Sequence, residues 1–258
     1  CITLAISFIK YIENQKSFKI FVAEIILMLI LAAMAELKYF YVEFIILIGV
    51  GMLCSRFSWK KLIIIVVAIM AIGIGYNVFV SVFPDINLSL VQLYEYASSD
   101  SGYTASGDLN RLNFMGTINN HFLTTIGDQL FGMGLGNCDY ATGMDFVTSP
   151  FSERYSYLHY SWMSTAFMYL ENGWLGLFLF FGFFIYVGVK SLQMAKNPRY
   201  NRVHCLIAAV CCVAAVLNGG YNTSLRIESG YMLYFIIAIP WCRQTYIRDN
   251  TKQILEVD

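Results

Sequence analysis

The chain has 258 residues, of which 58% are apolar, 16% are aromatic and 13% are charged, and its mean hydropathy is +0.59. Soluble domains contain about 45–50% apolar residues, so this composition predicts an all-α, polytopic membrane protein. The 17 basic and 17 acidic side chains cancel, and the sequence has no basic stripe of the kind that nucleic-acid binding requires, which excludes a nucleic-acid partner.

Apolar runs recur along the chain at lengths that suit membrane helices, which need about 20 residues per span. The first run begins at Cys1 with no charged segment or cleavage site before it, so we expect a truncated first span in a piece of a longer protein. Residues 36–38 predict a tight hairpin between two spans. The runs predict about six to seven spans, at residues 1–9, 20–35, 39–54, 62–83, 174–189, 203–219 and 231–242.

Basic residues indicate the orientation of these spans, because short cytoplasmic loops are enriched in Lys and Arg. Most of them lie in every second loop, which places residues 84–158 outside the cytoplasm. We therefore divide the chain into transmembrane helices at 1–83, one large extracytoplasmic helical loop at 84–158, and a C-terminal part at 159–258. That last part should hold an interfacial helix, three spans and a short cytoplasmic tail.

The outer loop is rich in aromatic residues, so we expect it to be folded rather than disordered. Apolar side chains three and four residues apart predict one amphipathic helix at 109–130 over the membrane mouth, with Asp108 as its N-cap. Gly132, Gly134 and Gly136 should then end this helix in a turn. A phosphate-binding loop is not expected there, because no strand precedes these glycines.

The histidines and cysteines have no metal-ligand spacing, so we expect neither a metal nor a cofactor. His121, His159 and His204 are far apart in the sequence. Cys138 is alone in the outer loop, so packing rather than a disulfide should hold that loop together.

Arginine is scarce on the outer side, where the large loop has eight carboxylates and only Arg111 and Arg154 as basic residues. Arg226 lies in the next outer loop. A guanidinium offers a planar fork of donors that suits phosphate oxygens. Each arginine could instead pair with a neighbouring carboxylate, such as Glu228 beside Arg226.

The stretch from His159 to Val189 is too long for one straight span. Its 31 residues would run about 46 Å as a helix, against a hydrocarbon core of about 30 Å. The sequence Glu-Asn-Gly at 171–173 suits a helix end or a kink. We therefore predict a short interfacial helix at 157–170, a break, and a span that starts at Trp174, with His159 at the outer membrane mouth.

Three stretches together resemble a known family. They are SGDLNRLNFMGTI, which contains Arg111, DQLFGMGLGNCDY, with its glycine turn, and LHYSWMSTAFMYLENGWLGLF, in which His159 precedes a Glu-x-Gly element. In this order they resemble the O-antigen ligase and O-antigen polymerase superfamily, the WaaL-type ligases and Wzy-type polymerases, over about residues 106–181. This sequence departs from the family in having Tyr160 where Asn is common, and in having fewer spans.

The resemblance implies a GT-C-like glycosyltransferase that uses no nucleotide sugar and no metal. Its donor would be a glycan on undecaprenyl pyrophosphate, and its acceptor another lipid-linked glycan or lipid A core. By motif position, Arg111 would engage the diphosphate and His159 would lie near the acceptor hydroxyl. Glu171, a candidate for substrate binding, and Gly173 would shape the turn.

Other outer residues are weaker candidates for the same site. Arg154 and Arg226 could bind the diphosphate, on charge and side alone. Tyr155 and Tyr157 could stack on sugar rings, although tyrosines near a membrane are often interfacial anchors. An arginine can stabilise the departing diphosphate, and a histidine can orient or deprotonate a hydroxyl.

We expect an O-antigen or capsule repeat-unit polymerase, multi-pass in the bacterial inner membrane, whose partners are the lipid bilayer, the lipid-linked substrates and other polysaccharide assembly proteins. A ligase that uses lipid A core remains an alternative, although Tyr160 departs from the ligase-like His-Asn pair. A non-enzymatic transporter or flippase of lipid-linked glycans is the other. Transporters usually show repeats and mid-membrane charges, whereas here no repeat is visible and Glu24 and Glu43 lie near span ends.

Overall fold

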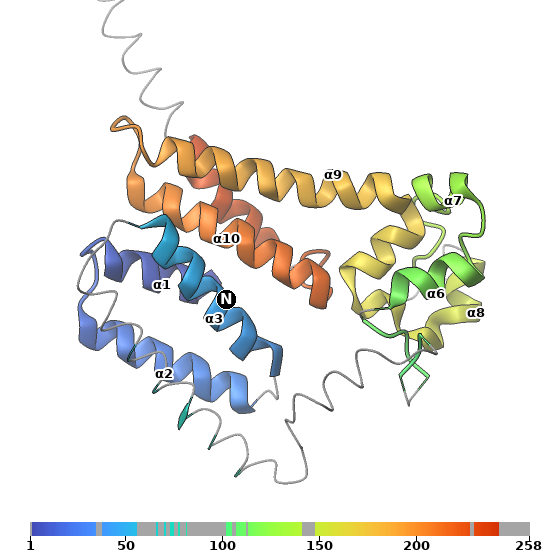
Figure 1. Ribbon diagram of the computed structural model, residues 1–258, viewed down its shortest axis with the longest axis horizontal. Coiled ribbons are helices and arrows are strands. Elements are labelled where there is room, and N and C mark those ends of the chain that lie inside the picture. Colours follow the sequence, from blue (N-terminus) through green and yellow to red (C-terminus); the bar gives the residue numbers. More distant parts are fainter. Residues whose placement is uncertain are drawn as a thin grey trace, which may run out of the picture. The chain divides into compact units, whose positions relative to one another are not determined.

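The computed structural model describes most of the chain, and in the described part every regular element is a helix (Figure 1). One isolated antiparallel bridge joins Tyr103 and Leu109. The all-α prediction is therefore confirmed for these residues. They are residues 2–34, 38–55, 102–104, 107–111, 113–140, 148–227 and 230–242, with isolated positions between 66 and 81.

The chain divides into two compact units, and unit 1 comprises Cys1–Ile86, Phe184–Leu217 and Gly230–Asp258. Its described helices are almost wholly apolar, and α1 packs against its two successors, with the Tyr11 ring stacked on Phe21 at 4.6 Å. The helices are α1 (Ile2–Ile12), α2 (Phe18–Met34), α3 (Lys38–Cys54), the second part of α9 (Ser164–Met194), most of α10 (Arg202–Tyr221), and a helix at Gly230–Cys242.

The predicted apolar runs that fall in the described part are all helical. Among the described helices, α9 and α10 are long and apolar enough to cross a membrane, while Ile2–Ile12, Tyr39–Cys54 and Gly230–Cys242 are shorter apolar helices. The predicted span at 62–83 falls almost wholly outside the described residues. The hairpin link at 36–38 and the tail after Cys242 also lie largely or entirely outside them.

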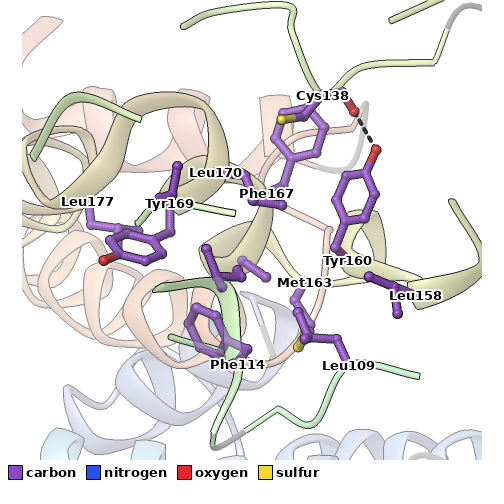
Figure 2. Close-up of a cluster of buried hydrophobic side chains, with 13 residues drawn as sticks. Leu109, Phe114, Cys138, Leu158, Tyr160, Met163, Phe167, Tyr169, Leu170 and Leu177 are labelled. Carbon is purple, nitrogen blue, oxygen red and sulfur yellow. Dashed lines mark hydrogen bonds between the residues drawn. The ribbon is translucent and has the colours of Figure 1, made fainter. Parts of the chain in front are cut away.

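Unit 2 comprises Asn87–Phe183 and Asn218–Ser229, and it contains the motifs that resemble the polysaccharide enzymes. Figure 2 shows its buried apolar cluster, to which the first part of α9 contributes Phe167, Tyr169 and Leu170. The remaining helices are short. They are α6 (Phe114–His121), α7 (Ile126–Phe131), α8 (Pro150–Tyr155) and two 3-10 turns, η2 (Ser156–Leu158) and η3 (Tyr160–Trp162).

The prediction of one amphipathic helix at 109–130 is wrong. The structure has two separate helices, α6 and α7, and Asp108 caps neither of them, because Asn113 and Thr125 occupy the N-cap positions. The Thr125 side chain accepts a hydrogen bond from the Asp128 backbone N–H at 3.1 Å. Such a local cap starts a new helix where the apolar periodicity alone suggested continuity.

The predicted break at Gly173 is confirmed, because this residue has non-helical angles (φ 58°, ψ −158°) inside α9. The helix before the break is shorter than predicted, since it begins at Ser164 rather than at residue 157. Ser164, Thr165 and Glu171 are buried in this segment, and its apolar residues belong to the buried cluster of unit 2.

Candidate functional site

Asp108 lies where residues 102–104 and 107–110 run side by side. The Thr104 N–H donates to the Asp108 carbonyl at 2.8 Å, and the Asn110 N–H donates to the Gly102 carbonyl at 3.0 Å. Gly107 allows the reversal between them because its φ is +87°. These backbone hydrogen bonds therefore hold the main chain at Asp108 in place.

His159 forms the central contact of the site with Asp108. The Leu109 N–H donates to the Leu158 carbonyl at 2.9 Å. Leu109 follows Asp108 and Leu158 precedes His159, so this hydrogen bond brings the two segments together beside both side chains. His159 Nδ1 then lies 2.5 Å from Asp108 Oδ1. Both side chains remain partly accessible, with exposed fractions of 39% and 26%. The pair can therefore be reached by a ligand from solvent.

The backbone of His159 has an unusual conformation that aims its ring. Its φ of 50° and ψ of 29° lie in the left-handed region, which non-glycine residues seldom adopt, and it separates the turns η2 and η3. The ring stacks on Trp162 with centroids 3.9 Å apart and planes 25° apart. Residues held in such conformations cluster at functional sites, so this one supports His159 as a functional candidate.

The predicted phosphate-binding arginines have different surroundings. The Arg111 guanidinium lies over the Tyr221 ring at 4.3 Å, and that of Arg226 lies over the Phe167 ring at 3.2 Å. Arg154 is exposed in the last turn of α8. Within the described part of the chain, none of these three guanidinium groups makes an ion pair. Glu228, the predicted neutralising partner of Arg226, lies outside the described residues.

Electrostatic surroundings distinguish Arg226 from the other arginines. Burial lowers its pKa, while the nearby carboxylates of Asp139 and Glu171 act in the opposite direction. An arginine stays protonated under such shifts. Arg226 is therefore a half-buried positive charge with two carboxylates nearby.

The loop that follows α10 is hydrogen-bonded to the start of α9. The carbonyl of Asn222 accepts hydrogen bonds from both the backbone N–H and the hydroxyl of Ser164, at 3.0 and 2.7 Å. Tyr221, on which Arg111 lies, precedes Asn222 directly. Arg111, His159 and Arg226 all belong to unit 2, although His159 and Arg226 are 67 positions apart in the sequence.

Glu171 is a buried carboxylate that holds the glycine turn. Its Oε1 accepts hydrogen bonds from the backbone N–H groups of Gly136 at 2.9 Å and Cys138 at 3.4 Å. Glu171 lies two residues before the kink at Gly173. Burial raises its pKa, and the two N–H donors partly offset that rise. These contacts make Glu171 a residue that shapes the turn rather than one that is open to a ligand.

The tyrosines differ in accessibility. Tyr155 packs edge-on against Phe122 with ring centroids 4.9 Å apart, whereas Tyr157 is 62% exposed. Tyr160 is buried, and its hydroxyl donates to the Cys138 carbonyl at 2.7 Å, as Figure 2 shows. The residue that departs from the family pattern is therefore part of the core.

Asp108 is the functional candidate whose role the sequence did not reveal. It lies 51 residues before His159, and a pattern search looks for partners at helical or loop spacing. Asp108 lies within the arginine motif, three residues before Arg111, and that position favours a helix cap. Among the described residues, no three His, Cys, Asp or Glu side chains converge as metal ligands would.

Comparisons of this chain with protein-family models, with curated proteins and with solved structures give no match.

Proposed function

We propose that this protein is a membrane glycosyltransferase that joins an undecaprenyl-pyrophosphate-linked glycan to an acceptor hydroxyl during assembly of a bacterial surface polysaccharide. The single observation that supports it most is the accessible Asp108–His159 pair, which shares one packed unit with Arg111 and Arg226. A carboxylate that orients a histidine suits deprotonation of an acceptor, and cationic groups in the same unit suit departure of an anion.

In this proposal His159 acts as the general base. Asp108 accepts the Nδ1–H of the ring, which leaves Nε2 with a lone pair to take the proton of the acceptor hydroxyl. The acceptor oxygen forms a bond to the anomeric carbon as the bond from that carbon to the diphosphate oxygen breaks. Attack opposite the leaving group inverts the anomeric configuration.

The arginines have the complementary role of stabilising the leaving group. Negative charge grows on the diphosphate as it departs, and a guanidinium fixed on an aromatic ring can meet that charge without reorganising. Arg111 and Arg226 are each fixed in this way, by Tyr221 and Phe167. Exposed Tyr157 offers an aromatic face for a sugar ring.

The acceptor that we favour is another lipid-linked repeat unit, which makes the enzyme a polymerase of O antigen or capsule in the inner membrane. The departure at Tyr160 from the ligase-like His-Asn pair supports this choice. A ligase would instead use lipid A core, and a transporter would form no bond. The purified full-length protein with lipid-linked oligosaccharide and no energy source separates these classes, because only a transferase lengthens or transfers the glycan.

Substitution in the full-length protein tests the site. His159→Gln and Arg111→Gln should each lower the rate of glycan transfer by about 10²–10⁴-fold, and long glycan chains should be lost as a result. His121→Gln is the matched control, since His121 is exposed on α6 and has no described carboxylate partner. Protein abundance in the membrane is measured alongside. Normal chains in both site variants would rule out the assignment.

A further inference from the structure

Helix α7 and the turn that follows it expose a continuous set of large apolar side chains. Ile126 is 78% exposed, Phe131 64% and Leu135 80%, and Leu130 is also exposed. No residue of α7 is buried. This differs from α6, which turns Phe114 and Ile118 into the core. A cluster of exposed apolar residues of this kind marks an interaction surface.

The polar groups of this surface are already partnered. Asp128 is the one ionisable side chain of α7, and the Thr125 hydroxyl donates to its carboxylate at 2.6 Å. The Asp128 backbone N–H in turn donates to the same hydroxyl oxygen. The segment 126–135 contains no Lys or Arg. It therefore offers no positive charge to an acidic partner.

The position of α7 is tied to the start of the membrane-length part of α9. A Cβ atom on Gly173 would lie 2.5 Å from the Gln129 and Leu130 carbonyl oxygens, so the two backbones are in direct contact there. The residues that follow Gly173 begin with exposed apolar side chains at Trp174 and Leu175. Figure 1 shows α7 beside this kinked end of α9.

The dimensions of α7 match the interfacial layer of a bilayer. Its six residues span about 9 Å at 1.5 Å per residue, so every side chain of α7 is close to the residue at which the span begins. The polar region on each side of the hydrocarbon core is about 5–8 Å thick. The exposed side chains are mostly aliphatic, which suits acyl chains better than a sugar, since Ile and Leu have no ring face for stacking.

We propose that residues Ile126 to Leu135, α7 and the first part of the glycine turn, insert into the bilayer interface next to the α9 span. Their apolar side chains bury among the outer acyl chains, and this anchors unit 2 at the membrane surface. Because the segment has no basic residue, its insertion depends on apolar burial and not on anionic lipid. This inference is independent of the proposed transferase activity.

Fluorescent labelling of the full chain in lipid nanodiscs tests the inference. Single cysteines at Ile126, Phe131 and Leu135 are labelled with an environment-sensitive NBD probe, in a parent with Cys54→Ser and Cys242→Ser. Labelling of that parent provides the background. Asn120→Cys is the matched control, since Asn120 is exposed on α6. Each variant is first shown to unfold thermally like the parent.

We expect blue-shifted emission at the three α7 and turn positions, with quenching by shallow doxyl lipids at least about twofold stronger than at position 120. The same result should hold in zwitterionic and in anionic lipids. Emission like that of position 120 would overturn the inference, because the patch would then face water. Blue-shifted emission without lipid quenching would also overturn it, because protein would then cover the patch.

Discussion

Gly132 and Gly173 lie where two segments of unit 2 cross backbone to backbone. A Cβ atom on Gly132 would be 2.4 Å from the Glu171 carbonyl carbon, and one on Gly173 would be 2.5 Å from the Leu130 carbonyl group. Both residues also have positive φ angles, +72° and +58°. The glycine turn and the Glu-x-Gly element are therefore one interlocked structure, in which each segment determines how closely the other can approach.

Alanine at either crossing position should strongly destabilise the protein. Gly132→Ala and Gly173→Ala each combine a left-handed backbone with a clash, for a combined cost of about 2–5 kcal/mol. Gly136→Ala has the positive φ without a neighbour within 4 Å, so it should cost only about 1–2 kcal/mol. Thermal unfolding of the detergent-solubilised protein measures the series.

The control for this series is Gly116→Ala, in α6. A methyl group added at Gly116 would have no neighbouring atom within 4 Å, and the residue has no positive φ, so alanine there should be neutral or stabilising by about 0.5–1 kcal/mol. Equal unfolding temperatures for Gly132→Ala and Gly116→Ala would contradict the close approach of the backbones at Gly132 and Glu171.

Removal of the Tyr160 hydroxyl should weaken unit 2 by about 1–3 kcal/mol, because the Cys138 carbonyl loses its 2.7 Å donor in a buried site. Tyr160→Phe keeps the ring and tests only the hydrogen bond. Tyr157→Phe serves as the comparison, since that side chain is 62% exposed and should leave stability unchanged. Chemical unfolding followed by fluorescence gives both values, and no difference between the variants would refute the role of the hydroxyl.

The Cys138 thiol should resist alkylation in the folded protein. Burial, together with the Glu171 and Asp139 carboxylates, raises its pKa to about 12. Only the thiolate reacts, and a raised pKa keeps the thiol protonated, so even at pH 10 about 1% of it would be ionised. Cys242 is exposed and should react at pH 8. Mass spectrometry after iodoacetamide treatment measures both sites, with denatured protein as the control in which Cys138 also reacts.

Asp108→Asn should lower transfer activity by about 10²–10⁴-fold while leaving the protein folded, because the ring of His159 loses the charge that orients Nδ1–H. The tautomer can be read separately from the ¹⁵N shifts of the histidine ring, with His159→Gln for assignment. Glu153→Gln, at an exposed site on α8, is the matched charge control. An unchanged ring spectrum in Asp108→Asn would show that the pair does not set the tautomer, whatever the activity.

Several features could be predicted from the sequence because they depend on local chemistry. Apolar runs located the helices of unit 1, since a helix made of apolar residues can be buried in a protein core or in a membrane. The kink at Gly173 followed from Glu-Asn-Gly and from length, because a straight helix of the 31 residues from His159 to Val189 would be longer than the hydrocarbon core is thick. The glycine turn after Phe131 followed from three residues that tolerate positive φ, and all three have it.

Other predictions failed where a local cap or a buried contact overrode the periodicity. The helix at 109–130 was wrong because Thr125 starts a new helix, and the helix at 157–170 was wrong in its first turns because His159 is left-handed. In the helix that does form, Ser164 is buried and its hydroxyl donates to the Asn222 carbonyl. Periodicity reports which residues share a face, but not which partner covers it.

The sequence by itself determined the apolar helices, the kink and the residue types of the candidate site, because hydropathy, length and side-chain chemistry are properties of the chain. Only the tertiary structure decided that Asp108 meets His159, that Arg111 and Arg226 rest on aromatic rings, and that Gly132 crosses Gly173. Each of these contacts joins residues about 40 or more positions apart. Such contacts depend on how whole segments pack, and no local sequence pattern shows which distant residues will meet.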